Sequence, residues 1–124
     1  MREAIKRHTI SFKHATEGLL WAVRSQPNFR VHMVLSVIAI AISLYFRITR
    51  VEWSIILFTI VLGLSSELIN TAIEAMTDLI TKEWKAEAKI AKDVSAGMML
   101  TVALGAIFVA LFIFFPYIQA LIRS

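Results

Sequence analysis

The amino-acid sequence predicts an all-α membrane protein with an N-terminal amphipathic surface helix and three transmembrane helices. The chain has 124 residues, and 58% of them are hydrophobic, which is too high a fraction for an ordinary soluble domain of this size. Its apolar residues form three runs, 31–46, 51–66 and 94–118. Each run, taken with its flanks, approaches the roughly 20 residues that a spanning helix needs. The net charge of +4 comes from basic residues that flank these runs, so a membrane surface suits them better than nucleic acid.

This length allows one domain and leaves no room for a second. The chain has no cysteine, which excludes a disulfide framework and a cysteine metal site. The basic N-terminus is not expected to be a cleavable signal, because no small-residue cleavage pattern follows the first apolar run. We expect a single integral-membrane domain over 1–124, with an interfacial helix over 1–26 and membrane helices over 29–46, 51–81 and 88–118.

The first helix is predicted to be amphipathic and too polar to cross a bilayer. Its apolar residues lie within about 40° of each other on a helical wheel, and its charged residues gather roughly 100° away. The apolar set is Ile5, Phe12, Leu19 and Val23, and the charged set is Lys6, Lys13, Glu17 and Arg24. This pattern is typical of a helix that lies among lipid headgroups. A solvent helix packed on another part of the protein is the alternative.

The distribution of basic residues predicts the orientation in the membrane. Residues 1–30 hold six Lys and Arg, and the segment 82–92 holds four. The connector between the first two spans holds only Arg47 and Arg50. By the positive-inside rule, the N-terminal segment and the 82–92 connector are cytoplasmic, and the C-terminus lies outside the plasma membrane.

Polar residues of the second span form one acidic stripe. Because a helix advances about 100° per residue, the stripe gathers on one narrow face. It consists of Glu67, Asn70, Glu74 and Asp78. An ionisable side chain inside a membrane span indicates a functional site by default. The alternative, a solvated face of a helix that leaves the membrane, suits Asp78 but not Glu67.

The depth of the two glutamates separates their expected roles. Measured from Trp53 at about 1.5 Å per residue, Glu67 lies roughly 21 Å inward and Glu74 roughly 31 Å, against a hydrocarbon thickness of about 30 Å. Glu67 is therefore expected within the inner leaflet, where a desolvated carboxylate is a competent proton acceptor. Glu74 is expected at the boundary, where it can meet hydrated Mg²⁺ and a phosphate.

Two other groups of polar residues flank the spans. Lys85, Lys89, Lys92 and Asp93 fall within about 100° on the third-span helix, where lysines facing the stripe could hold nucleotide phosphates. Lysines that snorkel at a helix end are the alternative. Arg30 could equally snorkel or take part in chemistry, and His32 is interpreted as a buried hydrogen-bonding histidine. Gly97, Thr101 and Gly105 form a small-residue seam for helix packing.

The motif Glu67-x-x-Asn70-x-Ala72-Ile73-Glu74-x-x-x-Asp78, followed by Ala91-Lys92-Asp93-x-x-Ala96-Gly97, resembles the prokaryotic diacylglycerol kinase and undecaprenol kinase family. The resemblance covers nearly the full length. Asn28-Phe-Arg-x-His32 and Ala88-Lys-Ile-Ala-Lys-Asp93 look more like the Gram-positive, undecaprenol-phosphorylating branch.

The resemblance implies a homotrimer with active sites shared between neighbours near the cytoplasmic interface, with ATP as co-substrate and Mg²⁺ as cofactor. It also implies a role for each matching residue. Glu67 resembles the catalytic base and Glu74 the metal ligand, with Asn70 and Asp78 in support. Lys92, Asp93 and Glu83, with Asp78, look like nucleotide contacts. Arg7 and His14 match positions that touch nucleotide or lipid, and His14 replaces a residue that is usually tyrosine.

One departure from the family pattern concerns a metal ligand. Gln26 stands where the family commonly has a glutamate that is a second metal ligand. An amide oxygen can coordinate Mg²⁺ but brings no charge. Either the metal is held more weakly here or another group, such as Asp78, supplies the charge.

Two functions from different classes fit these features. The first is a lipid kinase that moves the γ-phosphoryl group of Mg·ATP to the hydroxyl of a membrane lipid alcohol, undecaprenol or diacylglycerol. The sequence has no Walker A motif, which weakens a soluble-kinase interpretation. The alternative is a small ion- or proton-coupled transporter, since intramembrane carboxylates also mark ion paths. Against it, no polar residues continue the stripe to the outer side.

Overall fold

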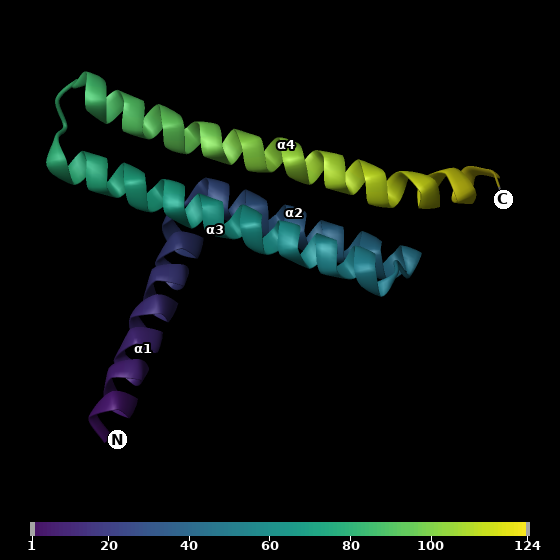
Figure 1. Cartoon of the computed structure of the whole chain (residues 1–124), viewed down its shortest axis with the longest axis horizontal. Coiled ribbons are helices and arrows are strands. Elements are labelled where there is room, and N and C mark those ends of the chain that lie inside the picture. The colour runs from purple at the N-terminus through teal and green to yellow at the C-terminus, as the bar shows by residue number, and fades with distance from the viewer. Residues whose placement is uncertain (1, 124) are drawn as a thin grey trace.

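The protein consists of four helices in the order α1 to α4. The structure is a computed structural model that describes the backbone of residues 2–123 and the side chains of residues 10–123. The helices are α1 (Arg2–Ser25), α2 (Pro27–Phe46), α3 (Arg50–Ile80) and α4 (Ala86–Arg123) (Figure 1). The last three are long and apolar enough to cross a membrane. The predicted all-α membrane architecture is therefore confirmed.

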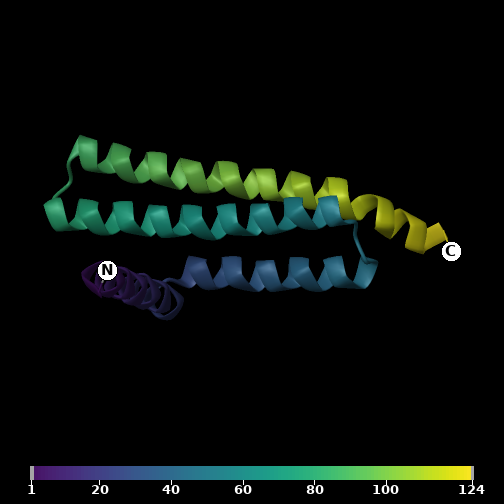
Figure 2. The same ribbon diagram turned by 60° about the horizontal axis from the view of Figure 1, so that its bottom comes forward.

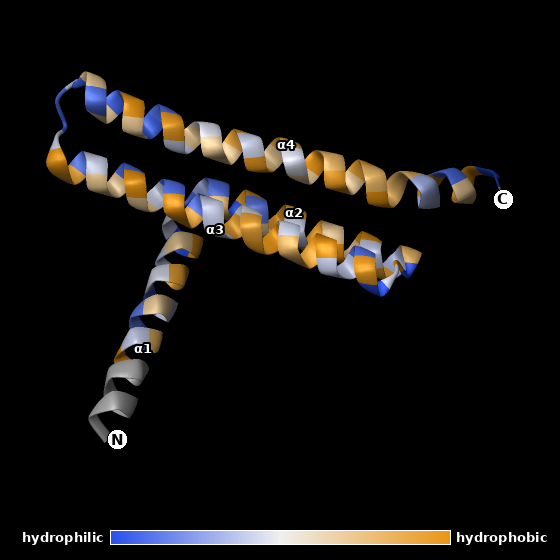
Figure 3. Ribbon diagram, in the orientation of Figure 1, coloured by the Kyte–Doolittle hydropathy of each residue, from blue (hydrophilic) through white to orange (hydrophobic). Residues whose placement is uncertain are grey.

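The three long helices lie side by side, and α3 packs against both of its neighbours. Figures 1 and 2 show that α1 projects sideways from the start of α2 and leaves the bundle. Both views also show that α3 and α4 continue beyond the start of α2 as far as their short connector. Figure 3 shows hydrophilic residues at that connector and mostly hydrophobic residues along the middle of the bundle. The two longer helices thus extend the bundle on the side where α1 leaves it.

Local backbone signals set the boundaries of α2 and α3. Pro27 occupies the first turn of α2, where its missing N–H costs no hydrogen bond. Arg47 ends α2 in the left-handed conformation with φ of 52°. The next helix begins at once, because the Thr49 side chain accepts from the backbone N–H of Glu52 while the Glu52 side chain accepts from that of Thr49. This reciprocal cap makes the turn between the two spans tight.

The end of the bundle opposite the connector between α3 and α4 holds an apolar cluster. Ile48, Ile56, Ile113 and Phe114 are buried together there. Phe46 of α2 stacks on Tyr117 of α4 with ring centroids 5.5 Å apart. The Tyr117 hydroxyl donates to Glu52 Oε2 at 2.8 Å, which links α4 to the cap of α3. All three spans are therefore held together at this end.

The fourth helix differs from its expected form in two ways. It begins at Ala86 and continues through Pro116 to Arg123, instead of running over 88–118. Figure 2 shows α4 bending near its C-terminal end, as expected of a proline that removes one helical hydrogen bond without ending the helix. The seam of Gly97, Thr101 and Gly105 is exposed, and a Cβ added at either glycine would meet no atom within 4 Å. The seam therefore does not pack helices within this chain, and its expected role in helix packing stays a prediction.

Candidate active site

Helix α3 carries a buried polar face in the middle of an apolar bundle. Glu67 is only 2% exposed and Asn70 only 6%. Nearby hydroxyls are used within the helix, because Ser66 donates to the Gly63 carbonyl and Thr77 to the Ile73 carbonyl. None of the side chains that the structure describes hydrogen-bonds the Glu67 carboxylate. A buried carboxylate without such a partner is costly, which favours a functional role for Glu67.

A cavity of about 330 Å³ opens beside Glu67. Helix α2 contributes Asn28 and His32 to its wall, and α3 contributes the glutamates and the amide of the stripe. Helix α4 closes it with small and apolar side chains, namely Ala96, Met99, Leu100 and Ala103. The cavity therefore joins one polar face of α2 and one of α3 under an apolar cover.

Asn70 lines the cavity with both glutamates and hydrogen-bonds one of them. Its Nδ2 donates to Glu74 Oε1 at 3.1 Å, while its Oδ1 is buried without a hydrogen-bond partner. Most buried polar atoms in proteins are paired, so this acceptor is available to a water molecule, a donor group or a cation. His32 and Glu74 line the same cavity as the Glu67 carboxylate. The cavity thus combines a buried carboxylate, a free acceptor and an exposed carboxylate.

The oxygen donors fit a magnesium ion that arrives with phosphates. Among the residues described, no cluster of three or more His, Cys, Asp or Glu side chains could hold a metal by itself. Mg²⁺ is commonly bound by one or two protein carboxylates, with substrate phosphates and water completing its shell. Glu74 and Asn70 Oδ1 could supply protein ligands of that kind. Gln26 does not line the cavity, and its side chain makes no helix-capping hydrogen bond.

An ion pair joins α3 and α4 at the end of the acidic stripe. Lys92 Nζ lies 2.6 Å from Asp78 Oδ1, across the two helices. Lys89 pairs with Asp93 along α4. Both pairs are substantially exposed, so they add little to stability. They place two lysines and two carboxylates on the connector side of the cavity.

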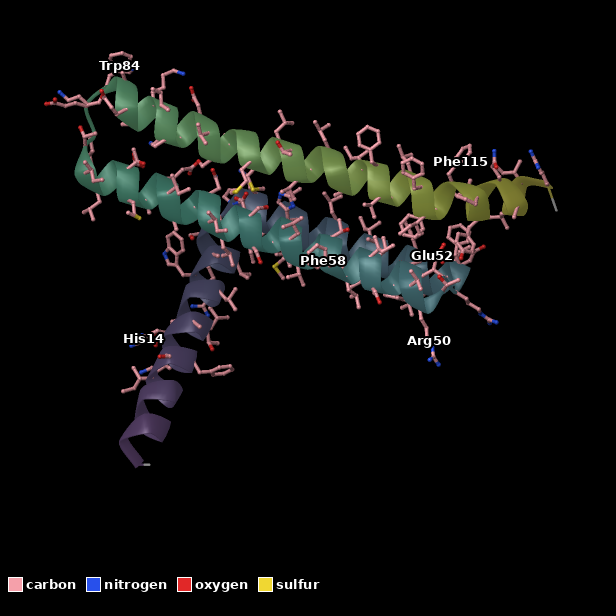
Figure 4. The ribbon with its side chains drawn as sticks, viewed as in Figure 1. His14, Arg50, Glu52, Phe58, Trp84 and Phe115 are labelled. Carbon is pink, nitrogen blue, oxygen red and sulfur yellow. The ribbon has the colours of Figure 1, made fainter. Side chains whose placement is uncertain are left out.

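Among the side chains that the structure describes, three further predicted residues do not line the cavity. Glu83 is exposed in the connector and pairs with Lys85 at 3.5 Å. His14 lies on α1, far from the bundle in Figure 4, and its Nδ1 is 3.1 Å from Glu17 Oε2. Arg30 is exposed near the start of α2. The Arg7 side chain lies outside the described residues.

Two cavity residues were not among the predicted site residues. Asn28 and His32 both line the cavity, although His32 was interpreted only as a hydrogen-bonding histidine. Their spacing of four residues places them on one face of a helix, directly after the helix-starting Pro27. That spacing could have predicted that Asn28 and His32 lie together on the face of α2 that lines the cavity.

A family model described as "Prokaryotic diacylglycerol kinase" matches residues 13–114. The chain belongs to this family. It is 35% identical to the undecaprenol kinase of Bacillus subtilis over 93% of this chain and 94% of that protein. It is 34% identical to a diacylglycerol kinase of Synechocystis over 81% of this chain and 58% of that protein. A diacylglycerol kinase of Pseudomonas aeruginosa is 31% identical over 74% of this chain and 75% of its own length.

Membership in the prokaryotic diacylglycerol kinase family confirms the predicted resemblance and makes the protein a lipid kinase. Its three apolar helices make it a membrane protein as well. A kinase of this family requires a phosphoryl donor and a lipid acceptor. The transporter alternative is not favoured, because the matching relatives are kinases.

Proposed function

We propose that the protein transfers the γ-phosphoryl group of Mg·ATP to the hydroxyl of a membrane lipid alcohol, undecaprenol or diacylglycerol. The observation that carries this proposal is the cavity in which a 2% exposed Glu67 lies beside an exposed Glu74. Phosphoryl transfer needs a base at the acceptor hydroxyl and charge neutralisation at the phosphates. The two glutamates are seven residues apart, or about 10 Å along the helix, which suits opposite ends of one reaction.

Glu67 is the base in this proposal. Its carboxylate accepts the proton of the lipid hydroxyl as the hydroxyl oxygen forms a bond to the γ-phosphorus. The bond between that phosphorus and the bridging oxygen of ADP breaks at the same time, and ADP keeps the electron pair. Low exposure keeps water away from the hydroxyl, so the lipid is phosphorylated in preference to water.

The phosphates are held on the other side of the cavity. Glu74 and Asn70 Oδ1 would hold Mg²⁺, which neutralises phosphate charge when it is bound. Lys92 would exchange its Asp78 partner for a phosphate oxygen, with Asp93 and Asp78 as further nucleotide contacts. Glu83 would contact ATP from the connector.

The membrane arrangement follows from the same proposal. The protein is an integral plasma-membrane domain with the N-terminus and the 82–92 connector in the cytoplasm and the C-terminus outside. ATP then reaches the open side of the cavity from the cytoplasm. A homotrimer would bring α1 of one protomer, with its Arg7 and His14, to the cavity of a neighbour.

The test is the variant Glu67→Gln, purified and assayed for transfer of the terminal phosphate of ATP to lipid in mixed micelles. We expect its kcat to fall by about 100-fold or more, since general-base catalysis typically contributes that much. Its assembly, followed by gel filtration, should be unchanged. Glu52→Gln is the matched control, because Glu52 lies on the same helix but at the outer end.

Two outcomes would contradict the proposal in different ways. Full activity of Glu67→Gln would remove Glu67 as the base and leave the kinase intact. Failure of the unmodified protein to phosphorylate either lipid would reject both acceptors.

A further inference from the structure

His32 of α2 is a half-buried polar side chain that packs against α3 close to the proposed base. Its imidazole lines the same cavity as Glu67. A Cβ added at Gly63 would lie 3.7 Å from His32 Nδ1, so the ring lies over the part of α3 where the glycine has no side chain. Gly63 precedes Glu67 by four residues, which places the two on one face of α3. The imidazole therefore lies about one helical turn from the Glu67 backbone.

The directions of the two helices bring the His32 and Glu67 side chains toward each other. Helices α2 and α3 are antiparallel neighbours that are joined by the tight turn after Phe46. Side chains on a helix lean toward its N-terminus. His32 therefore leans toward the end of the bundle where α1 leaves, and Glu67 leans the opposite way, toward Glu52. Because Glu67 lies one turn nearer to the connector of α3 and α4 than Gly63, these two directions converge.

The cavity contains few donors that could hold the Glu67 carboxylate. Among the described residues that line it, only Asn28, His32 and Asn70 carry side-chain donors. The Asn70 amide already donates to Glu74. Asn28 is exposed and leans away from Glu67, because it lies one turn nearer to the start of α2 than His32. The imidazole of His32 is therefore the donor best placed for the buried carboxylate.

We propose that His32 is a positioning residue for Glu67. Its imidazole N–H donates a hydrogen bond to one oxygen of the Glu67 carboxylate in the reacting complex, and the other oxygen is left to accept the proton of the lipid hydroxyl. Hydrogen bonds of this kind often tighten only once the substrate is bound. His32 keeps its own proton throughout, so it sets the direction of the base without taking part in the proton transfer. This inference rests on the proposed function, in which Glu67 is the base, and adds a residue to which that function gives no role.

The first experiment compares His32→Ala with His32→Gln in the mixed-micelle kinase assay. In His32→Ala we expect kcat to fall by roughly tenfold, the scale of one hydrogen bond to a charged group. The KM for ATP should stay unchanged, because the hydrogen bond acts on the base and not on the bound nucleotide. His32→Gln should recover much of the lost kcat, since its amide N–H can donate to the same carboxylate. The unfolding temperature should stay near the wild-type value in both variants.

Ser36→Ala is the matched control for the first experiment. Ser36 lies one turn further along α2 than His32, and its hydroxyl donates to the His32 carbonyl at 2.7 Å within the helix. Its removal changes the neighbourhood of His32 but leaves the imidazole in place, so the wild-type kcat should be kept. His32→Leu, a residue of similar size that has no donor, replaces His32→Ala in both experiments if the alanine variant does not assemble.

The second experiment tests whether His32 acts through Glu67. If it does, the two substitutions are not additive, and adding His32→Ala to Glu67→Gln should lower the remaining kcat by less than about twofold. Asn28→Ala is measured in the same way as the rival donor. Its effect on kcat should be the same factor with and without Glu67→Gln.

Several outcomes would overturn the role of His32 and leave the lipid kinase intact. These are an unchanged kcat in His32→Ala, a further tenfold loss when it is added to Glu67→Gln, and non-additivity with Asn28→Ala instead. If His32 were merely structural, the unfolding temperature would fall in His32→Ala and glutamine would not restore kcat. Full activity of Glu67→Gln, or phosphorylation of neither lipid by the unmodified protein, would instead contradict the proposed function itself.

Discussion

Asn70 is a buried residue of the candidate site whose side-chain amide is only partly hydrogen-bonded. It holds Glu74 through one amide hydrogen and leaves Oδ1 buried and unpaired. An unpaired buried acceptor costs about 1–3 kcal/mol, which would be recovered when a cation or a donor binds. Replacement by a residue without the amide would free Glu74 to rotate, so Asn70 positions the proposed metal ligand as well as offering a ligand itself.

Gln26 supports a prediction about the metal. Its side chain makes no capping hydrogen bond with α2, and it lies two residues before Asn28 of the cavity wall. In Gln26→Glu, the added charge should lower the Mg²⁺ concentration for half-maximal activity by roughly threefold or more. The measurement is a Mg²⁺ titration of the kinase rate at fixed ATP, with Gln119→Glu near the C-terminus as the control. An unchanged titration would mean that position 26 is not a metal ligand here.

Residues of the site could be predicted where they share one helix. Helical periodicity alone placed Glu67, Asn70 and Glu74 on one face, and the structure brings these three to one cavity. The same reasoning could not place His32 in the cavity with Glu67, because the two residues are on different helices and their proximity depends on how α2 packs on α3. The spacing of residues in the sequence predicts which of them share one face of a helix, but not which other helix packs against that face.

Helix α3 is the element on which the bundle is organised. It packs against α2 and α4, carries the candidate site toward its C-terminal half and is capped at its start by Thr49 and Glu52. Figure 4 shows Glu52 and Trp84 at opposite ends of the bundle. The Glu52 end of the bundle is therefore stabilised by packing and capping, while the candidate site lies toward the other end.

A prediction at the scale of the elements concerns the hydrogen bond between Tyr117 of α4 and Glu52 of α3. Tyr117→Phe removes the hydrogen bond from α4 to Glu52 and should lower the free energy of unfolding by about 0.5–1.5 kcal/mol. The measurement is equilibrium unfolding in detergent, with kinase activity expected to stay unchanged. Tyr45→Phe is the control, because Tyr45 is 69% exposed. Equal stability of the two variants would show that the link from Tyr117 to Glu52 contributes nothing.

The boundaries of the elements were predictable to different degrees. Pro27 and the tight turn after Phe46 gave clear signals, so the expected ends of the first two spans lie within a few residues of α2 and α3. The end of α4 was placed at 118, yet the helix continues through Pro116 to Arg123. Proline removes one hydrogen bond but does not always end a helix, and the sequence does not show which outcome packing selects.

At the scale of the whole molecule, the single chain separates residues that the family resemblance assigns to one site. Helix α1 leaves the bundle, and no residue of α1 lines the Glu67 cavity among the described side chains. The seam of Gly97, Thr101 and Gly105 is exposed on α4. An arrangement in which α1 serves a neighbouring protomer would satisfy both observations. The sequence could predict the surface helix from its amphipathic pattern, but its direction relative to the bundle depends on the junction at residue 26.

The last prediction tests that sharing by mixing two inactive variants. One carries Glu67→Gln, and the other carries Arg7→Ala with His14→Ala. If α1 of one protomer serves the cavity of another, about a quarter of the sites in an equal, randomly mixed homo-oligomer receive both intact parts. Activity should then reappear at about that fraction of the wild-type rate when the proteins are unfolded together and reconstituted.

Each protein reconstituted alone is the control. If both parts of a site came from one chain, no mixed oligomer could contain an intact site and the mixture would stay inactive. An active Arg7 and His14 double variant would contradict the role of α1 directly.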